Sequence, residues 1–108
     1  MKLRIGDLRH RITIQKLEMI QDSYGQATET WVDVVTVFAA VNPISGREFF
    51  KAETINSEIT HRILIRYRKG IEPSMRVNFK GRIFTILSVI NFQEKNEALQ
   101  LMCKEMID

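Results

Sequence analysis

The sequence predicts a mainly β protein: a small antiparallel β-barrel of about six strands, with one short helix inserted between the second and third strands. Short runs of alternating apolar and polar side chains recur along the 108 residues, and turn-forming residues separate them. Some of these runs are apolar on both faces, which favours a barrel because closure removes exposed strand edges. A capping pattern between two of the runs indicates the helix.

The first predicted strand covers residues 11–15, where alternation turns Ile12 and Ile14 toward the core. Leu17 and Met19 are out of phase with that pair. We therefore expect a β-bulge, or the end of the strand, directly after this run.

A loop follows over residues 21–26, where Asp, Ser and Gly favour turn conformations. Residues 28–41 are rich in β-branched side chains, and both faces of their second half are apolar. This composition predicts a central strand covered on both sides. The Asn42-Pro43 pair ends it, because proline lacks the N–H group that a strand ladder needs.

Ser45 and Glu48 are three residues apart, the spacing of a helix capping box. The helix is expected to run about three turns, to Ile55. Phe49 and Phe50 lie about 100° apart on such a helix, so one ring can enter the core while the other is left for a partner.

The remaining strands are shorter, and their turns are clearly marked. The Lys80-Gly81 pair predicts a tight hairpin in which glycine supplies the positive φ. The loop over 91–97 is polar. The predicted strands cover residues 61–68, 76–79, 82–90 and 98–103.

Composition is ordinary for a globular protein, with 44% hydrophobic and 27% charged residues. No apolar run approaches the roughly 20 residues that span a bilayer, so we expect no membrane association. The N-terminus has no apolar stretch typical of a secretory signal. Cys103 is the single cysteine and cannot form an internal disulfide, which fits a reducing compartment.

Charge is arranged in blocks, although the net charge is only +3. Counting Lys and Arg against Asp and Glu gives +4 for residues 1–16, −5 for 17–60, +6 for 61–82 and −2 for 83–108. Such alternation suits a protein that meets copies of itself or other proteins through complementary patches.

No group of residues predicts catalysis, a metal ion or a cofactor. His10, His61 and Cys103 are far apart and lack the spacing of metal ligands. Ser45 has no nearby histidine, and its capping role accounts for it. The glycines form no phosphate-binding loop. We therefore expect a protein that is not an enzyme.

The candidate basic surface consists of Arg62, Arg66, Arg68 and Lys69, on one face of the strand over 61–68 and at its end. It can be a solvated outer face that pairs with the acidic block, or it can contact nucleic-acid phosphates. The second reading makes a small nucleic-acid-binding β-barrel the alternative function. Tyr67 is the only aromatic ring close to these arginines, and alternation turns it away from them.

Three stretches carry a resemblance to a known family: GDLRHRITIQ, DSYGQATETWVDVVTVFAAVNPISGREFFKA and EITHRILIRYRKGIEPSMRV. Together they resemble the bacteriophage head-tail joining family, the head-completion or stopper proteins of tailed phages and prophages. The resemblance covers nearly the whole chain and implies one head-tail joining domain over residues 1–108.

The resemblance implies a β-barrel that assembles in the virion as a ring, typically of twelve copies, beneath the portal and adaptor of a DNA-filled head. Such a ring continues the DNA channel with passing DNA contact, helps to retain DNA and offers a platform for tail proteins. The connection over residues 44–59 would face the channel or a neighbour. Candidate assembly or channel-facing residues are Arg47, Glu48, Phe50 and Lys51. We expect assembly in the host bacterial cytoplasm, and a free chain that is monomeric or weakly associated.

Overall fold

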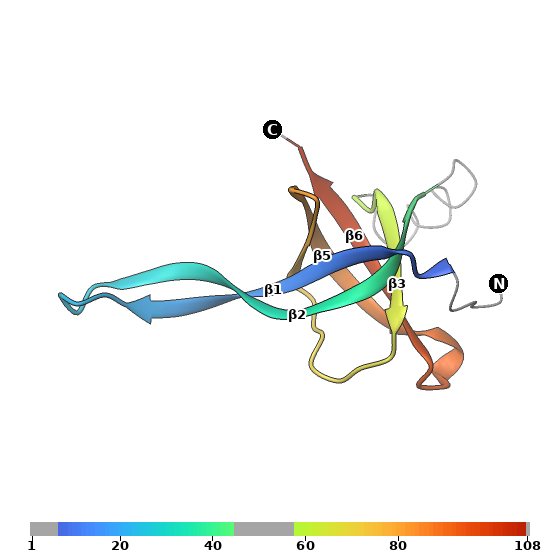
Figure 1. The fold of residues 1–108 in the computed structure, drawn as a ribbon, viewed down its shortest axis with the longest axis horizontal. Coiled ribbons are helices and arrows are strands. Elements are labelled where there is room, and N and C mark those ends of the chain that lie inside the picture. Colours follow the sequence, from blue (N-terminus) through green and yellow to red (C-terminus); the bar gives the residue numbers. More distant parts are fainter. Residues whose placement is uncertain (1–6, 45–57, 108) are drawn as a thin grey trace.

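The computed structural model describes residues 7–44 and 58–107, which form a closed antiparallel β-barrel (Figure 1). The elements, in chain order, are β1 (His10–Gln21), β2 (Ala27–Pro43), β3 (His61–Arg66), β4 (Arg76–Phe79), β5 (Arg82–Asn91), the short 3-10 helix η2 (Phe92–Glu94) and β6 (Ala98–Met106). The predicted fold class is confirmed. Within the described ranges, no helix is both long and apolar enough to cross a bilayer.

The strands close in the order β1-β2-β3-β6-β5-β4, and every neighbouring pair is antiparallel. Closure depends on a short ladder in which Thr13 to Gln15 of β1 pair with Asn78 to Arg76 of β4. Closing the barrel leaves no unpaired strand edge around its core.

The core lies inside the barrel and receives side chains from all six strands. The alternation that the sequence predicts for the first and last strands is confirmed, since Ile12, Ile14, Leu99, Leu101 and Cys103 are all buried. The largest buried side chain is Phe84, which is 0% exposed. Core members from the other strands and the β3–β4 connection include Ala39, Ile63, Ile65, Ile71, Val77, Phe79 and Ile86.

The first strand is longer than predicted, because β1 and β2 continue together beyond the barrel. Residues 16–32 form a two-stranded projection, which we call the arm, joined by a turn at Asp22 to Gln26 (Figure 1). Residues 16–30 are all exposed. The phase change at Leu17 and Met19 therefore marks the place where β1 leaves the core, and the strand does not end there.

Two β-bulges change which side chains face the core. The β1–β2 register skips Val34, and the β5–β6 register skips Leu87. Each extra residue shifts the alternation by one position, so even-numbered residues can face the core before the bulge and odd-numbered residues after it. A run that looks apolar on both faces can therefore have only one buried face. In β5, the buried Phe84 and Ile86 precede the bulge, and Val89 packs on the core after it.

The prediction that both faces of the second half of residues 28–41 are covered is therefore only partly right. The first part of this run lies in the arm, and Phe38 is 54% exposed on the outside of the barrel. Only Ala39 and Ala40 of β2 are buried. Ala40 packs with Leu64 and with Leu8 from the N-terminal lead, in a small cluster separate from the main core.

The β4–β5 hairpin agrees with its prediction. Lys80 (φ 52°) and Gly81 (φ 83°) are the two loop residues between the paired Phe79 and Arg82. Positive φ at both positions is typical of a type I′ turn, whose twist matches that of the flanking strands. The helix predicted from Ser45 lies outside the described residues. Strand β3 ends at Arg66, two residues earlier than predicted.

Candidate assembly surface

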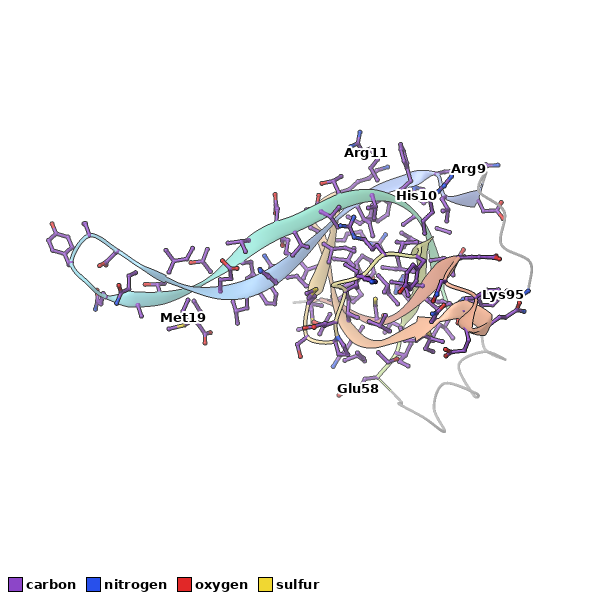
Figure 2. The ribbon with its side chains drawn as sticks, turned by 90° about the horizontal axis from the view of Figure 1, so that it is seen from below. Arg9, His10, Arg11, Met19, Glu58 and Lys95 are labelled. Atoms are coloured by element: carbon purple, nitrogen blue, oxygen red, sulfur yellow. The ribbon has the colours of Figure 1, made fainter. Side chains whose placement is uncertain are left out.

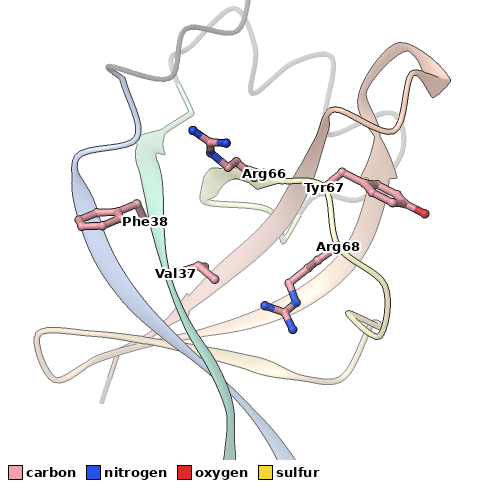
Figure 3. Close-up of a pocket in the computed structure, with 5 residues that line it drawn as sticks. All are labelled: Val37, Phe38, Arg66, Tyr67 and Arg68. Atoms are coloured by element: carbon pink, nitrogen blue, oxygen red, sulfur yellow. The ribbon is translucent and has the colours of Figure 1, made fainter.

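The predicted basic residues Arg66 and Arg68 line an open pocket of about 330 Å³, together with Val37, Phe38 and Tyr67. We call this the arginine pocket. Figure 3 shows both arginine side chains extending toward β2 and the Tyr67 ring pointing away from it. The predicted orientation of Tyr67 is thus confirmed.

The pairing of β2 with β3 explains why these side chains meet. Ala39 lies opposite Ile65, so Phe38 and Arg66 are near neighbours where the ladder ends. The guanidinium carbon of Arg11 lies 5.4 Å from the centre of the Phe38 ring. Aromatic and arginine side chains are the types enriched at the centres of protein interfaces, and here both are exposed to solvent.

Tyr67 anchors the floor of the arginine pocket to the barrel. Its ring packs against the main core, and its backbone N–H donates a 3.0 Å hydrogen bond to the carbonyl of Glu97. The two flanking arginines are therefore held in place by a rigid backbone while their side chains stay exposed.

Arg62 is separated from this pocket. It is half-buried, lies opposite Asn42 of β2 and Met102 of β6, and does not line the pocket with Arg66 and Arg68. Lys69 is exposed in the turn after Arg68. The structure thus divides the predicted basic surface, because Arg62 is half-buried while Arg66, Arg68 and Lys69 are exposed.

The candidate assembly residues Arg47, Glu48, Phe50 and Lys51 lie outside the described residues. Sequence reasoning missed two exposed features, the arm and Phe38. The sequence contained a signal for the exposure of Phe38. Thr36 lies two residues earlier, so both side chains point to the same face of the strand, and a polar residue on that face indicates that it is turned outward. Thr36 is indeed exposed, and its hydroxyl lies 3.0 Å from that of Thr13.

A second polar group lies at one end of β3, where His61, Glu105 and Arg82 meet. Arg82 donates two hydrogen bonds of 2.9 Å to the Glu105 carboxylate, one from Nε and one from a terminal nitrogen. The His61 Nε2 atom lies 3.9 Å from that carboxylate. The same ring lies edge-on to Phe84, with the centroids 4.9 Å apart.

The surroundings of these groups shift their proton affinities. Burial lowers the pKa of His61, which the charge of Glu105 partly opposes. The hydrogen bonds from Arg82 lower the pKa of Glu105. Burial raises the pKa of the Cys103 thiol to about 12. The thiol is therefore protonated and inert near neutral pH.

His61 and Cys103 are opposite each other across β3 and β6, although they are distant in sequence. The pairing does not create a metal site, because Cys103 is fully buried and the described residues contain no cluster of three His, Cys, Asp or Glu that could hold an ion. Among these residues, no polar or charged residue is fully buried. The group at His61 is best explained as structural.

Acid is expected to destabilise the barrel through His61 and Glu105. His61 has a folded pKa below its ordinary value of 6.5, so the unfolded chain binds more protons there and stability falls as the pH drops through 6.5. Glu105 has a folded pKa below 4.5, so its contribution is lost at lower pH.

Thermal melts from about pH 7.5 to about pH 5.5 measure the first step. The His61→Gln variant should make the melting temperature depend less on pH in that range. The fall in melting temperature below pH 4.5 should remain. If His61→Gln keeps the wild-type slope, His61 is not the titrating group.

The chain matches a family model described as phage head completion protein over residues 3–106. The chain belongs to the phage head completion protein family. It is 36% identical over 76 residues to head completion protein gp16 of Bacillus phage SPP1, with 70% of each chain covered. It is 28% identical over 104 residues to head completion protein gp7 of Enterobacteria phage HK97, covering 92% of this chain and 93% of the relative.

Two solved structures resemble the chain in fold. Protein SF1141 from Shigella flexneri 2a is similar with a TM-score of 0.79 and 33% identity, over 98% of this chain and 99% of that one. A chain of the virion of a native gene transfer agent particle has a TM-score of 0.67 at 20% identity, over 99% and 100% of the two chains, and shares the fold.

These findings confirm the resemblance predicted from the sequence. The chain has a structural role at the phage head-tail connector, and the alternative of a nucleic-acid-binding barrel is not favoured. The relatives are head completion proteins, which agrees with the expectation of a non-enzymatic role.

Proposed function

We propose that the chain forms a ring at the head-tail connector of a tailed phage or prophage, where it completes the DNA-filled head, helps to retain DNA and provides the platform for the tail. The match to head completion proteins over residues 3–106 is the observation that carries this proposal. Its partners are portal and adaptor ring proteins on one side and tail proteins on the other.

The ring needs a heterologous interface, in which one patch of each copy fits a different patch of the next. The blocks of opposite charge along the chain supply complementary patches of this kind. We propose twelve copies in the virion, formed on the portal in the host bacterial cytoplasm. Passing DNA would meet the basic residues Arg66, Arg68 and Lys69 only if this part of the barrel faces the channel.

Reversing the charges of Arg47, Glu48 and Lys51 tests the proposed assembly segment. We expect the triple variant, with Arg47→Glu, Glu48→Lys and Lys51→Glu, to fold normally and to lower the yield of infectious particles by about tenfold or more, because reversed charges repel the partner surface. Circular dichroism checks the fold, and a virion-completion assay measures the yield.

Lys95→Glu is the matched control, since it changes the net charge by −2, as the triple variant does, at an exposed residue after η2. The control should complete heads normally. Fully infectious particles from the triple variant would remove this segment from the assembly surface.

A further inference from the structure

The arm is an exposed surface with few contacts to the rest of the described chain: Lys16 pairs with Glu18 at 2.9 Å and the Trp31 ring lies against Arg76, and residues 16–30 are all exposed. Residues directly opposite each other in a two-stranded ribbon share a face. Leu17 lies opposite Trp31, Met19 opposite Glu29, and Gln21 opposite Ala27. One face of the arm therefore carries the apolar side chains of Leu17, Met19, Ala27 and Trp31, which we call the apolar row, beside the polar Gln21 and Glu29. Leu17 is 45% and Met19 64% exposed. Figure 2 shows the Met19 side chain standing clear of the ribbon.

The tip of the arm is a built turn that presents an aromatic ring. The Asp22 Oδ1 atom accepts hydrogen bonds of 2.9 Å from the backbone N–H groups of Tyr24 and Gln26. Gly25 adopts φ 80°, a conformation that favours glycine. The Tyr24 side chain, held on this ordered turn, is 93% exposed. Large exposed aromatic side chains are typical interface anchors.

The arm and the arginine pocket are complementary in charge and in polarity. Residues 16–32 contain one lysine against three carboxylates, a net charge of −2. The pocket is lined by the apolar side chains of Val37 and Phe38, by Tyr67, and by the positively charged Arg66 and Arg68. An acidic, apolar projection thus faces outward on the same chain that exposes a pocket lined by apolar and basic side chains. Opposed charges steer such surfaces together.

The arm cannot reach the pocket of its own chain. It leaves the barrel on one side, in the direction of the longest dimension of 51 Å (Figure 1). From Val37 to Ala27, β2 rises about 33 Å at roughly 3.3 Å per residue. Pairing with β1 continues on both sides of the bulge at Val34, and the arm projects away from the barrel, so it does not fold back (Figure 1). The complementary occupant of the pocket is therefore on another molecule.

We infer that the arm of one copy docks on the arginine pocket of a second copy, with its apolar row and Tyr24 against Phe38 and its carboxylates beside the arginines. This contact joins two different patches, so each copy still offers one free arm and one free pocket, and the contact can repeat around a ring. The inference deepens the proposed function, because it names the surfaces that would hold neighbouring copies together.

A photo-crosslinking experiment tests the contact directly. Tyr24→p-benzoylphenylalanine is mixed in concentrated solution at low ionic strength with an isotope-labelled copy that carries the natural Tyr24. We expect light-induced dimers in which residue 24 is joined to the labelled chain at residues 37–38 or 66–69. Low salt favours the encounter because exposed charges are then least screened. The same probe in place of Lys95, which lies away from the arm (Figure 2), should give at least about tenfold fewer dimers.

A charge exchange separates specific docking from random collision. Glu29→Arg and Arg68→Glu should each lower the dimer yield by about fivefold or more, and a chain that carries both should recover it. Dimers joined elsewhere, no dimers, or preferential cross-links to added duplex DNA would overturn the inference. A head-completion assay then separates the two proposals, because arm variants that complete heads normally overturn this contact and leave the proposed function standing.

Discussion

Replacing Phe84 by alanine is expected to lower the free energy of unfolding by about 3–5 kcal/mol. The ring is 0% exposed, fills the centre of the barrel and lies edge-on to His61 with the centroids 4.9 Å apart. Its removal loses the transfer free energy of the ring and leaves a cavity among packed neighbours. For a domain of this size, a loss of about 4 kcal/mol lowers the melting temperature by roughly 20 °C.

Phe38→Ala is the matched control, because it deletes the same side chain from the outside of the barrel. Phe38 is 54% exposed, and the guanidinium carbon of Arg11 lies 5.4 Å from its ring centre. We expect it to cost less than about 1 kcal/mol. Chemical denaturation of both variants measures the difference. Equal losses would mean that the barrel does not place the two rings on opposite sides of its wall.

Much of the barrel could be predicted because strand period and turn chemistry act locally. Lys80-Gly81 specifies a tight hairpin whatever surrounds it, and the alternation of Leu99, Leu101 and Cys103 defines a buried face without knowledge of the partner strand. The family resemblance, which the comparisons confirm, rests on these same stretches and covers nearly the whole chain.

The arm and the bulges could not be predicted in the same way. Periodicity gives the phase of a strand, and it does not say which part of the strand lies over the core. Residues 16–30 still carry apolar side chains, such as Leu17, Met19 and Ile20, although they are all exposed. The sequence predicted a β-bulge or a strand end directly after residues 11–15, and a register shift lies between Ile14 and Gln15. That the extra residues are Val34 and Leu87 becomes visible only when the opposing residues are known. When both even-numbered and odd-numbered residues of a strand are apolar, either both faces are covered or a bulge shifts the alternation. The sequence does not distinguish these two cases.

The candidate surface was also predicted only in part, because strand period is local and packing between distant segments is not. Alternation predicted one face for Arg66 and Arg68; both line the arginine pocket, although β3 ends at Arg66. The partial cover over Arg62 and the exposure of Phe38 depend on which segments pack outside the barrel. Those contacts join residues distant in sequence, so no local pattern encodes them.

Shortening the arm is expected to abolish head completion while leaving the barrel folded. In this variant, Asn-Gly replaces residues 19–29, so that Glu18 and Thr30, which are already paired, become the ends of a two-residue hairpin. The replaced residues are all exposed, so we expect a change in the free energy of unfolding of about 1 kcal/mol or less. The Trp31 ring keeps its contact with Arg76, whose guanidinium carbon lies 4.3 Å from the ring centre.

The yield of infectious particles should fall by about 100-fold or more, because the docking element is gone while the pocket remains. A second variant, with Leu17→Thr and Met19→Thr, keeps the length of the arm and removes only its apolar row. If that row provides the contact, both variants fail to complete heads and both melt near the wild-type temperature. If the variant with threonine at both positions completes heads normally, the length of the arm is required and its apolar row is not. A shortened chain that completes heads normally would show that neighbouring copies are held together by other surfaces.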